Sequence, residues 1–190
     1  LEFGNDEVYY WTYAKYPDWS HFDHPGMVGW VMQLFSLNLL FDSELALRLS
    51  SVVFMTINTY IIYKMGCLIK NKLTGFYAAL LYTSSVYAFV VTGILILPDT
   101  PLMLFMLLSL YCFLRFFIGR EKNNGENSKN DNVLLVLGGF LAGLSMLSKY
   151  SGVFIWSGVG LYVLLYDRKL LKNKYLYISV FLSALCLLPL

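Results

Sequence analysis

The chain has 190 residues, of which 58% are hydrophobic and only 14% are charged. Soluble domains carry about 25% charged residues, so this chain has too few to cover a water-exposed surface and belongs in a lipid bilayer. The net charge of +2 gives no reason to expect a nucleic-acid partner. The three cysteines are scattered through apolar segments and indicate neither a disulfide framework nor a metal cluster.

The first polar stretch, residues 5–26, combines acids, imidazoles and aromatic rings. Its candidate catalytic and binding side chains are Asp6, Glu7, Tyr9, Tyr10, Asp23 and His24. Together such groups can hold a sugar and move a proton. The alternative is a helix on the membrane surface, with a belt of Tyr and Trp at headgroup level.

Two short helices are expected in residues 1–42, which we predict to form an extracytoplasmic loop. The first covers residues 5–16, where Asn5 or Asp6 can cap it and Pro17 ends it. The second lies within the apolar residues 27–41. A membrane span needs about 20 residues, so this segment is predicted to be interfacial or re-entrant.

Residues 43–190 are expected to hold about six membrane-spanning segments. These are residues 43–65, 73–92, 102–118, 133–148, 153–166 and a last one from residue 175 onward. Ser43 and Glu44 suit a helix start. The pair Gly139 and Gly143 has the spacing of close helix packing. Because the chain begins without Met and ends in an apolar run, we expect it to be an excerpt of a longer membrane protein.

The basic turns predict which loops share a side of the membrane. Residues 64–72, 120–132 and 167–174 hold most of the Lys and Arg, which places them in the cytoplasm. Residues 5–26, the loop around Asp99 and the turn at Lys149 then share the extracytoplasmic face. This holds only if residues 27–41 do not cross the membrane.

Three further charged residues have both a structural and a functional interpretation. Arg48 could pair with Glu44 one turn away, could extend its guanidinium to the membrane interface, or could bind a phosphate. Asp99 could cap the helix that follows it, or could orient a hydroxyl or bind a cation. Lys149 could extend to the membrane interface, or could bind a phosphate as a point charge.

The chemistry of these groups suits transfer of a sugar from a lipid phosphate to a hydroxyl group. Asp6 and Glu7 diverge by about 100° on a helix, so one can act as general base while the other packs or pairs. Positive charge can stabilise the phosphate leaving group. Asp23 and His24 could bind phosphate or a divalent metal, although their spacing matches no recognised zinc pattern. No other cofactor is indicated.

Five motifs in register carry a family resemblance. They are Asp6-Glu7-x-Tyr9-Tyr10, Asp23-His24-Pro25, Ser43-Glu44-x-x-x-x-Arg48-Leu49-x-Ser51, Pro98-Asp99-x-Pro101-Leu102 and Gly143-Leu144-x-x-Leu147-Ser148-Lys149-Tyr150-x-Gly152. This order resembles the polyprenyl-phosphate-sugar-dependent glycosyltransferases of the protein O-mannosyltransferase and aminoarabinose transferase group. The likeness covers about residues 5–165.

The resemblance implies an all-α integral membrane protein of the GT-C type, with membrane-parallel helices in its first extracytoplasmic loop. It implies inverting transfer with Asp6 as catalytic base, Asp99 as supporting carboxylate and Asp23-His24 near the sugar donor's phosphate. Relatives often carry a second proline where this chain has Gly26. The acceptor would be a lipid, glycan or protein hydroxyl.

The expected protein is therefore a glycosyltransferase of the hexosyl, mannosyl or aminoarabinosyl type, in the bacterial inner membrane with its active site facing outward. A membrane transporter or lipid-carrier flippase is the main alternative, and a non-catalytic scaffold is another. Inverted repeats and charges deep in mid-span would favour a transporter. The sequence contains no internal repeat, and its predicted spans are nearly free of charge.

Overall fold

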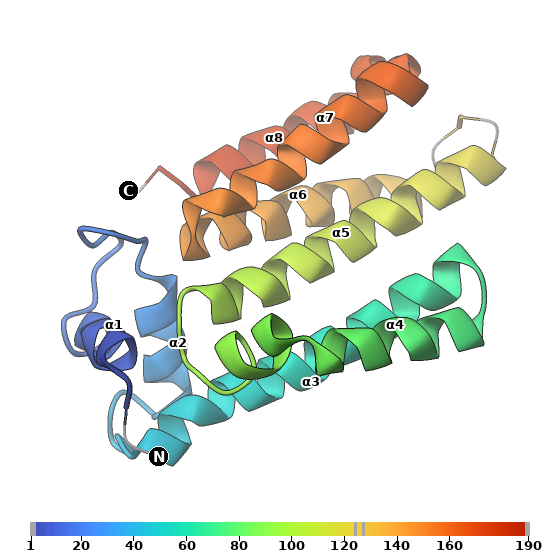
Figure 1. Ribbon diagram of the computed structural model, residues 1–190. Coiled ribbons are helices and arrows are strands. Elements are labelled where there is room, and N and C mark those ends of the chain that lie inside the picture. Colours follow the sequence, from blue (N-terminus) through green and yellow to red (C-terminus); the bar gives the residue numbers. More distant parts are fainter. Residues whose placement is uncertain (1–2, 124, 127, 189–190) are drawn as a thin grey trace.

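The computed structural model describes residues 3–123, 125–126 and 128–188. All the regular elements within these ranges are helices, which confirms the predicted all-α membrane fold. The long helices form a bundle, and α1 and α2 lie together at one end of it (Figure 1). Three places lie at the other end: the turn between α3 (Glu44–Ile69) and α4 (Lys72–Ser84), the end of α5 (Asp99–Lys122) with the start of α6 (Lys129–Ser148), and the connection between α7 (Phe154–Tyr166) and α8 (Lys174–Leu185).

Helix α1 spans Asn5–Lys15 and ends before Pro17, as predicted. The predicted cap is wrong, because neither Asn5 nor Asp6 supplies it. Instead the carboxylate of Glu7 turns back and accepts a hydrogen bond from the backbone N–H of Gly4 at 3.1 Å. This leaves the side chain of Asp6 exposed at the start of the helix.

The connection from α1 to α2 is a tight loop that requires glycine at its end. Ser20 and Pro25 form an isolated antiparallel bridge, and the N–H of Gly26 donates to the carbonyl of Trp19 at 2.9 Å. A Cβ at Gly26 would collide with the carbonyl oxygen of Asp18. A proline there would add bulk and remove the hydrogen bond, so the departure from the family pattern has a steric reason.

Helix α2 spans Met27–Phe35 and reaches only about 14 Å, too short to cross a bilayer. This agrees with the prediction for residues 27–41. The chain then turns through Leu37, Asn38 and Leu39, all with positive φ, before α3 begins. The buried face of α2 packs on the long helices through Val28 and Met32.

Among the residues that the structure describes, three helices are long and apolar enough to cross a membrane. They are α3 (Glu44–Ile69), α5 (Asp99–Lys122) and α6 (Lys129–Ser148). Shorter elements complete the bundle: α4 (Lys72–Ser84), η2 (Tyr150–Val153), α7 (Phe154–Tyr166), η3 (Arg168–Lys172) and α8 (Lys174–Leu185). Ser43 caps α3 as predicted, because its hydroxyl accepts from the N–H of Ala46 at 3.3 Å.

The predicted span over residues 73–92 is not one continuous helix. Helix α4 ends at Ser84, whose hydroxyl donates to the carbonyl of Leu80, and Ser85 is extended. A short π-helical turn, η1 (Tyr87–Val91), follows and leads into the loop before Asp99. Serine hydroxyls that bond back to the helix compete with its backbone ladder, which accounts for a break that hydropathy does not reveal.

Helices α6 and α8 pack closely through small residues. A Cβ at Gly139 would collide with the hydroxyl of Ser179, and one at Gly143 would lie 2.9 Å from Cα of Ser183. The hydroxyl of Ser179 donates to the carbonyl of Leu135 at 2.8 Å. The predicted packing role of the two glycines is confirmed, and serines on α8 form the facing surface.

Candidate functional site

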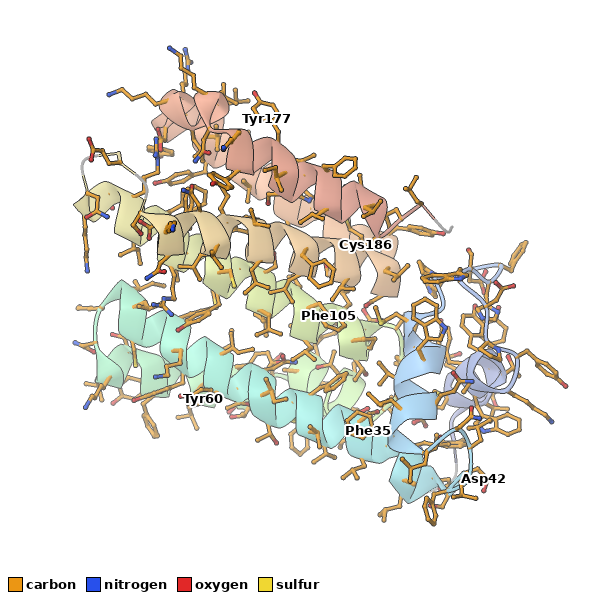
Figure 2. The ribbon with its side chains drawn as sticks, turned by 180° about the vertical axis from the view of Figure 1, so that it is seen from behind. Phe35, Asp42, Tyr60, Phe105, Tyr177 and Cys186 are labelled. Carbon is orange, nitrogen blue, oxygen red and sulfur yellow. The ribbon has the colours of Figure 1, made fainter. Side chains whose placement is uncertain are left out.

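Charged and aromatic side chains gather at the end of the bundle that α1 and α2 cover. Figure 2 shows Phe35 and Asp42 at this end, with Tyr177 lying toward the opposite one. The segments that meet here are α1, the loop before α2, the loop before α5 and the end of α6. They carry the groups that the sequence singled out as catalytic or binding residues.

The first pair in this cluster is Asp99 and Lys149, which are 50 residues apart in the sequence. The ammonium of Lys149 donates to both carboxylate oxygens of Asp99 at 3.0 Å. The hydroxyl of Tyr87 donates to Asp99 Oδ1 at 2.6 Å. Asp99 is the first residue of α5 and its side chain caps nothing, so its interpretation as a helix cap is wrong.

Glu7 and Arg48 form the second pair. Arg48 Nε donates to Glu7 Oε1 at 2.9 Å, and Nη2 donates to Oε2 at 2.5 Å. Arg48 therefore forms its salt bridge with Glu7, while Glu44 one turn away adds attraction at longer range. The predicted Glu44–Arg48 pair is replaced by a partner from another segment, because α1 folds back over the start of α3.

The carboxylate of Glu7 also joins the two loops on this face. The backbone N–H of Ile96, in the loop before Asp99, donates to Glu7 Oε1 at 3.2 Å. Burial alone would raise the pKa of Glu7, but the hydrogen bonds from Arg48, Gly4 and Ile96 outweigh it and lower this pKa below 4.5. The side chain is only 1% exposed, so Glu7 is a buried anion.

Asp6 differs from its neighbour in exposure. It lines a small cavity of about 290 Å³ together with Leu95 and Leu97, which belong to the loop that leads into Asp99. The divergence expected of adjacent helical residues is therefore present. Glu7 points into the protein, whereas Asp6 stays accessible at the cavity.

The tyrosines of α1 lie among the acidic side chains of this cluster. Tyr9 donates its hydroxyl proton to Asp23 Oδ2 at 3.0 Å, and its ring lies 5.3 Å from that of Tyr10. Burial raises the pKa of Tyr10 to about 12, and the charges of Asp6, Asp23 and Asp99 contribute in that order. Tyr10 is thus within electrostatic reach of all three carboxylates.

His24 is half-buried beside the same groups. Burial lowers the pKa of His24 below 6.5, Lys149 lowers it further, and Asp23 and Asp99 oppose the shift. Burial and the charge of Lys149 therefore favour the neutral imidazole. Its buried Nδ1 has no hydrogen-bond partner among the described residues, and its ring lies 5.9 Å from Tyr10.

Asp23 and His24 were also candidates for holding a divalent metal. Within the part of the chain that the structure describes, no three His, Cys, Asp or Glu side chains converge as metal ligands. The carboxylate of Asp23 is instead bonded to Tyr9.

Two contributors to this cluster were missed from the sequence, and one contact of a residue in the polar stretch 5–26 was not foreseen. Tyr87, which bonds Asp99, fell inside the predicted span over residues 73–92. The backbone N–H of Ile96 carries no sequence signal at all. His21 stacks on Tyr13 with ring centroids 3.6 Å apart, and this pairing follows only from the fold of the loop.

Comparison with known families supplies independent information. The family model for dolichyl-phosphate-mannose-protein mannosyltransferases matches residues 23–190. The match includes His24, Arg48, Asp99 and Lys149 but begins after α1, so Asp6 and Glu7 lie outside it. Neither the curated proteins nor the solved structures yield a match to the chain. The chain belongs to the dolichyl-phosphate-mannose-protein mannosyltransferase family, which are membrane glycosyltransferases of the GT-C type.

Proposed function

We propose that the protein transfers a sugar from a polyprenyl-phosphate carrier to a hydroxyl group of a lipid, glycan or protein. The observation that carries this proposal is the Asp99–Lys149 salt bridge, which lies beside His24 and the tyrosines of α1. A cation, several carboxylates and aromatic rings meet at one end of an apolar bundle. Such a site can hold a charged phosphate and a sugar while the carrier's tail stays in lipid.

Lys149 is the proposed contact for the phosphate of the sugar donor. Its side chain is 34% exposed although it is paired, so it can reach a ligand at the surface of the cluster. Asp99, which also accepts a hydrogen bond from Tyr87, holds it in place. As the bond between the anomeric carbon and the phosphate oxygen breaks, negative charge grows on the leaving phosphate, and the ammonium stabilises that charge.

Asp6 is the proposed general base. The acceptor hydroxyl attacks the anomeric carbon from the face opposite the phosphate and gives its proton to Asp6, which inverts the configuration. The new carbon–oxygen bond joins the sugar to the acceptor, and polyprenyl phosphate leaves. The exposure of Asp6 at a cavity beside the Asp99 loop supports this role.

Glu7 and Arg48 are proposed to position the segments that carry the site. Their side chains are 1% and 14% exposed and bind each other, which supports a structural role. Glu7 also lines the cavity at Asp6. Tyr9, Tyr10, Asp23 and His24 remain the proposed contacts for the sugar and its phosphate. The neutral imidazole of His24 can donate or accept a hydrogen bond there.

The proposed orientation places this site on the outer face of a bacterial inner membrane. The support comes from the basic turns, which lie at the end of the bundle opposite the site. The same orientation lets a lipid-linked sugar meet acceptors outside the cytoplasm.

The test supplies membranes that contain the full-length protein with a panel of polyprenyl-phosphate sugars. We expect one donor to give both free polyprenyl phosphate and a glycosylated acceptor of inverted configuration. Transport of the intact carrier without release of polyprenyl phosphate would overturn the proposal and favour a flippase. Release with retained configuration would contradict the single displacement by Asp6.

A further inference from the structure

A second groove lies at the end of the bundle opposite the acidic cluster. It has a volume of about 640 Å³ and runs between α5 and the end of α7. Its walls combine two tyrosines, Tyr162 and Tyr166, with the cations Arg168 and Lys169. None of these four residues belongs to the site proposed for sugar transfer.

The charges in this groove leave two cations available to a ligand. At its edge Arg120 binds Asp167, so these two charges compensate each other. Arg168 and Lys169 are exposed, and neither has a salt bridge within the described part of the chain. Glu121 also lines the groove, which leaves a net charge of one positive unit over these five residues.

Arg168 is held in position by its own backbone contact. Its Nε donates to the carbonyl of Leu164 one turn earlier at 2.9 Å. Arg168 is exposed, and a guanidinium can bind a phosphate through two oxygens. Burial of Leu170 anchors η3, the short helix that carries both cations.

An apolar groove continues from the charged one along the same two helices. It has a volume of about 310 Å³ and shares Phe117 and Tyr162 with the first groove. Its other lining residues are apolar, and Gly158 opens one side because a Cβ there would meet nothing within 4 Å. A polar chamber that continues into an apolar slot has the shape and chemistry of a phospholipid.

We propose that these joined grooves bind one anionic phospholipid, with its headgroup phosphate on Arg168 and Lys169 and an acyl chain in the slot beside Gly158. Basic and aromatic pockets between membrane helices suit such headgroups. The ligand is not the sugar donor of the proposed reaction. Asp99 and Arg120 are separated along α5 by about 31 Å, so one phosphate cannot occupy both ends.

The test measures lipid bound to the purified full-length protein by native mass spectrometry. The protein is equilibrated with equal amounts of phosphatidylglycerol and phosphatidylcholine. We expect phosphatidylglycerol to be retained preferentially. The double variant Arg168→Gln/Lys169→Gln should weaken that retention roughly thirtyfold. The matched control Lys70→Gln/Lys72→Gln removes two cations from another turn at the same end and should leave retention unchanged.

A second pair of variants tests the slot without touching a charge. Gly158→Phe places a ring in the apolar groove and should reduce retention of phosphatidylglycerol. Gly160→Phe also enters open space on α7, but Gly160 does not line the slot, so retention should not change.

Three outcomes would overturn the proposal. The first is equal retention of the two phospholipids. The second is a loss of phosphatidylglycerol retention in the control variants as large as in the test variants. The third is displacement of the bound lipid by polyprenyl phosphate. Sugar transfer is measured separately at the other end of the bundle, so its failure is distinguishable from failure of lipid binding.

Discussion

Glu7 and Arg48, 41 residues apart in the sequence, form a salt bridge in which two guanidinium N–H groups bind one buried carboxylate. The same carboxylate accepts N–H groups from Gly4 and Ile96. It therefore ties the start of α1 to α3 and to the loop that precedes Asp99. Asp6 is adjacent to Glu7 in the sequence, so we expect the Glu7–Arg48 pair to fix the position of Asp6 relative to the loop that precedes Asp99.

Breaking this pair should destabilise the fold strongly. Glu7→Gln removes the negative charge that Arg48 binds here, together with strong hydrogen bonds to a buried carboxylate, which costs about 3 kcal/mol. Thermal and denaturant unfolding in detergent measure the loss. Asp6→Asn is the matched control, because it changes an exposed neighbour and should shift stability by less than about 0.5 kcal/mol. A similar loss of stability in both variants would contradict the finding that Glu7 is buried and Asp6 is exposed.

The two partners should also be energetically coupled. In a double-mutant cycle with Glu7→Gln and Arg48→Gln, the second substitution should cost much less once the first is present. We expect a coupling free energy of at least about 1 kcal/mol. Additive costs would mean that the two side chains do not interact in the folded protein.

The stabilising effect of Glu7 should depend on pH with a defined sign. Its pKa is below 4.5 in the folded protein, so its contribution is complete above pH 4.5 and is lost as pH falls through the lowered value. The difference in unfolding free energy between the wild type and Glu7→Gln should narrow below pH 4.5. A difference that stays constant down to about pH 3 would contradict the lowered pKa.

Lys149→Ala should weaken binding of the sugar donor while leaving the protein inserted. The substitution removes the proposed phosphate contact and leaves Asp99 without its cation. The dissociation constant of a polyprenyl-phosphate sugar is the measurement, and we expect an increase of about tenfold or more. Lys15→Ala, which removes an exposed cation on α1, is the control. An unchanged constant in Lys149→Ala would exclude the phosphate role.

Close packing of α6 on α8 should make Gly139 intolerant of a side chain. Gly139→Ala forces a methyl group against Ser179 and should cost about 1–3 kcal/mol of stability. Gly160→Ala adds the same group where nothing lies within 4 Å and should be neutral or slightly stabilising. Comparable melting temperatures for the two variants would contradict the observed contact.

Hydropathy and charge predicted those features of the fold that depend on long, uniform segments. Helices α3, α5 and α6 are long and apolar enough for hydropathy to identify them as membrane-spanning candidates. The apolar segment that holds α2 is too short to cross a membrane, as predicted. The break after Ser84 was not predictable from hydropathy. It depends on local hydroxyl bonds and on the packing of η1, which apolar composition does not record.

In the candidate site, too, some features were predictable from the sequence and others depend on the fold. The residue types at Asp6, Asp99 and Lys149 identified them as candidates, because unexplained charges are rare in a chain of this composition. The sequence also placed Asp99 and Lys149 on one face, and their salt bridge agrees with this prediction. The pairing of Glu7 with Arg48 was not predictable, since Arg48 had a plausible local partner in Glu44. Only the path of α1 over α3 brings Glu7 to Arg48 and leaves Asp6 at the cavity.

The assignment of Asp6 as general base is the central claim, and one measurement tests it most directly. Purified full-length Asp6→Asn is compared with the wild type for release of polyprenyl phosphate from its lipid-linked sugar, after both show the same melting temperature. Asp18→Asn, an exposed acid on the following loop, is the control and should keep wild-type release. We predict that Asp6→Asn binds the sugar donor normally and releases no polyprenyl phosphate to an acceptor. Wild-type release by Asp6→Asn would contradict the proposed mechanism.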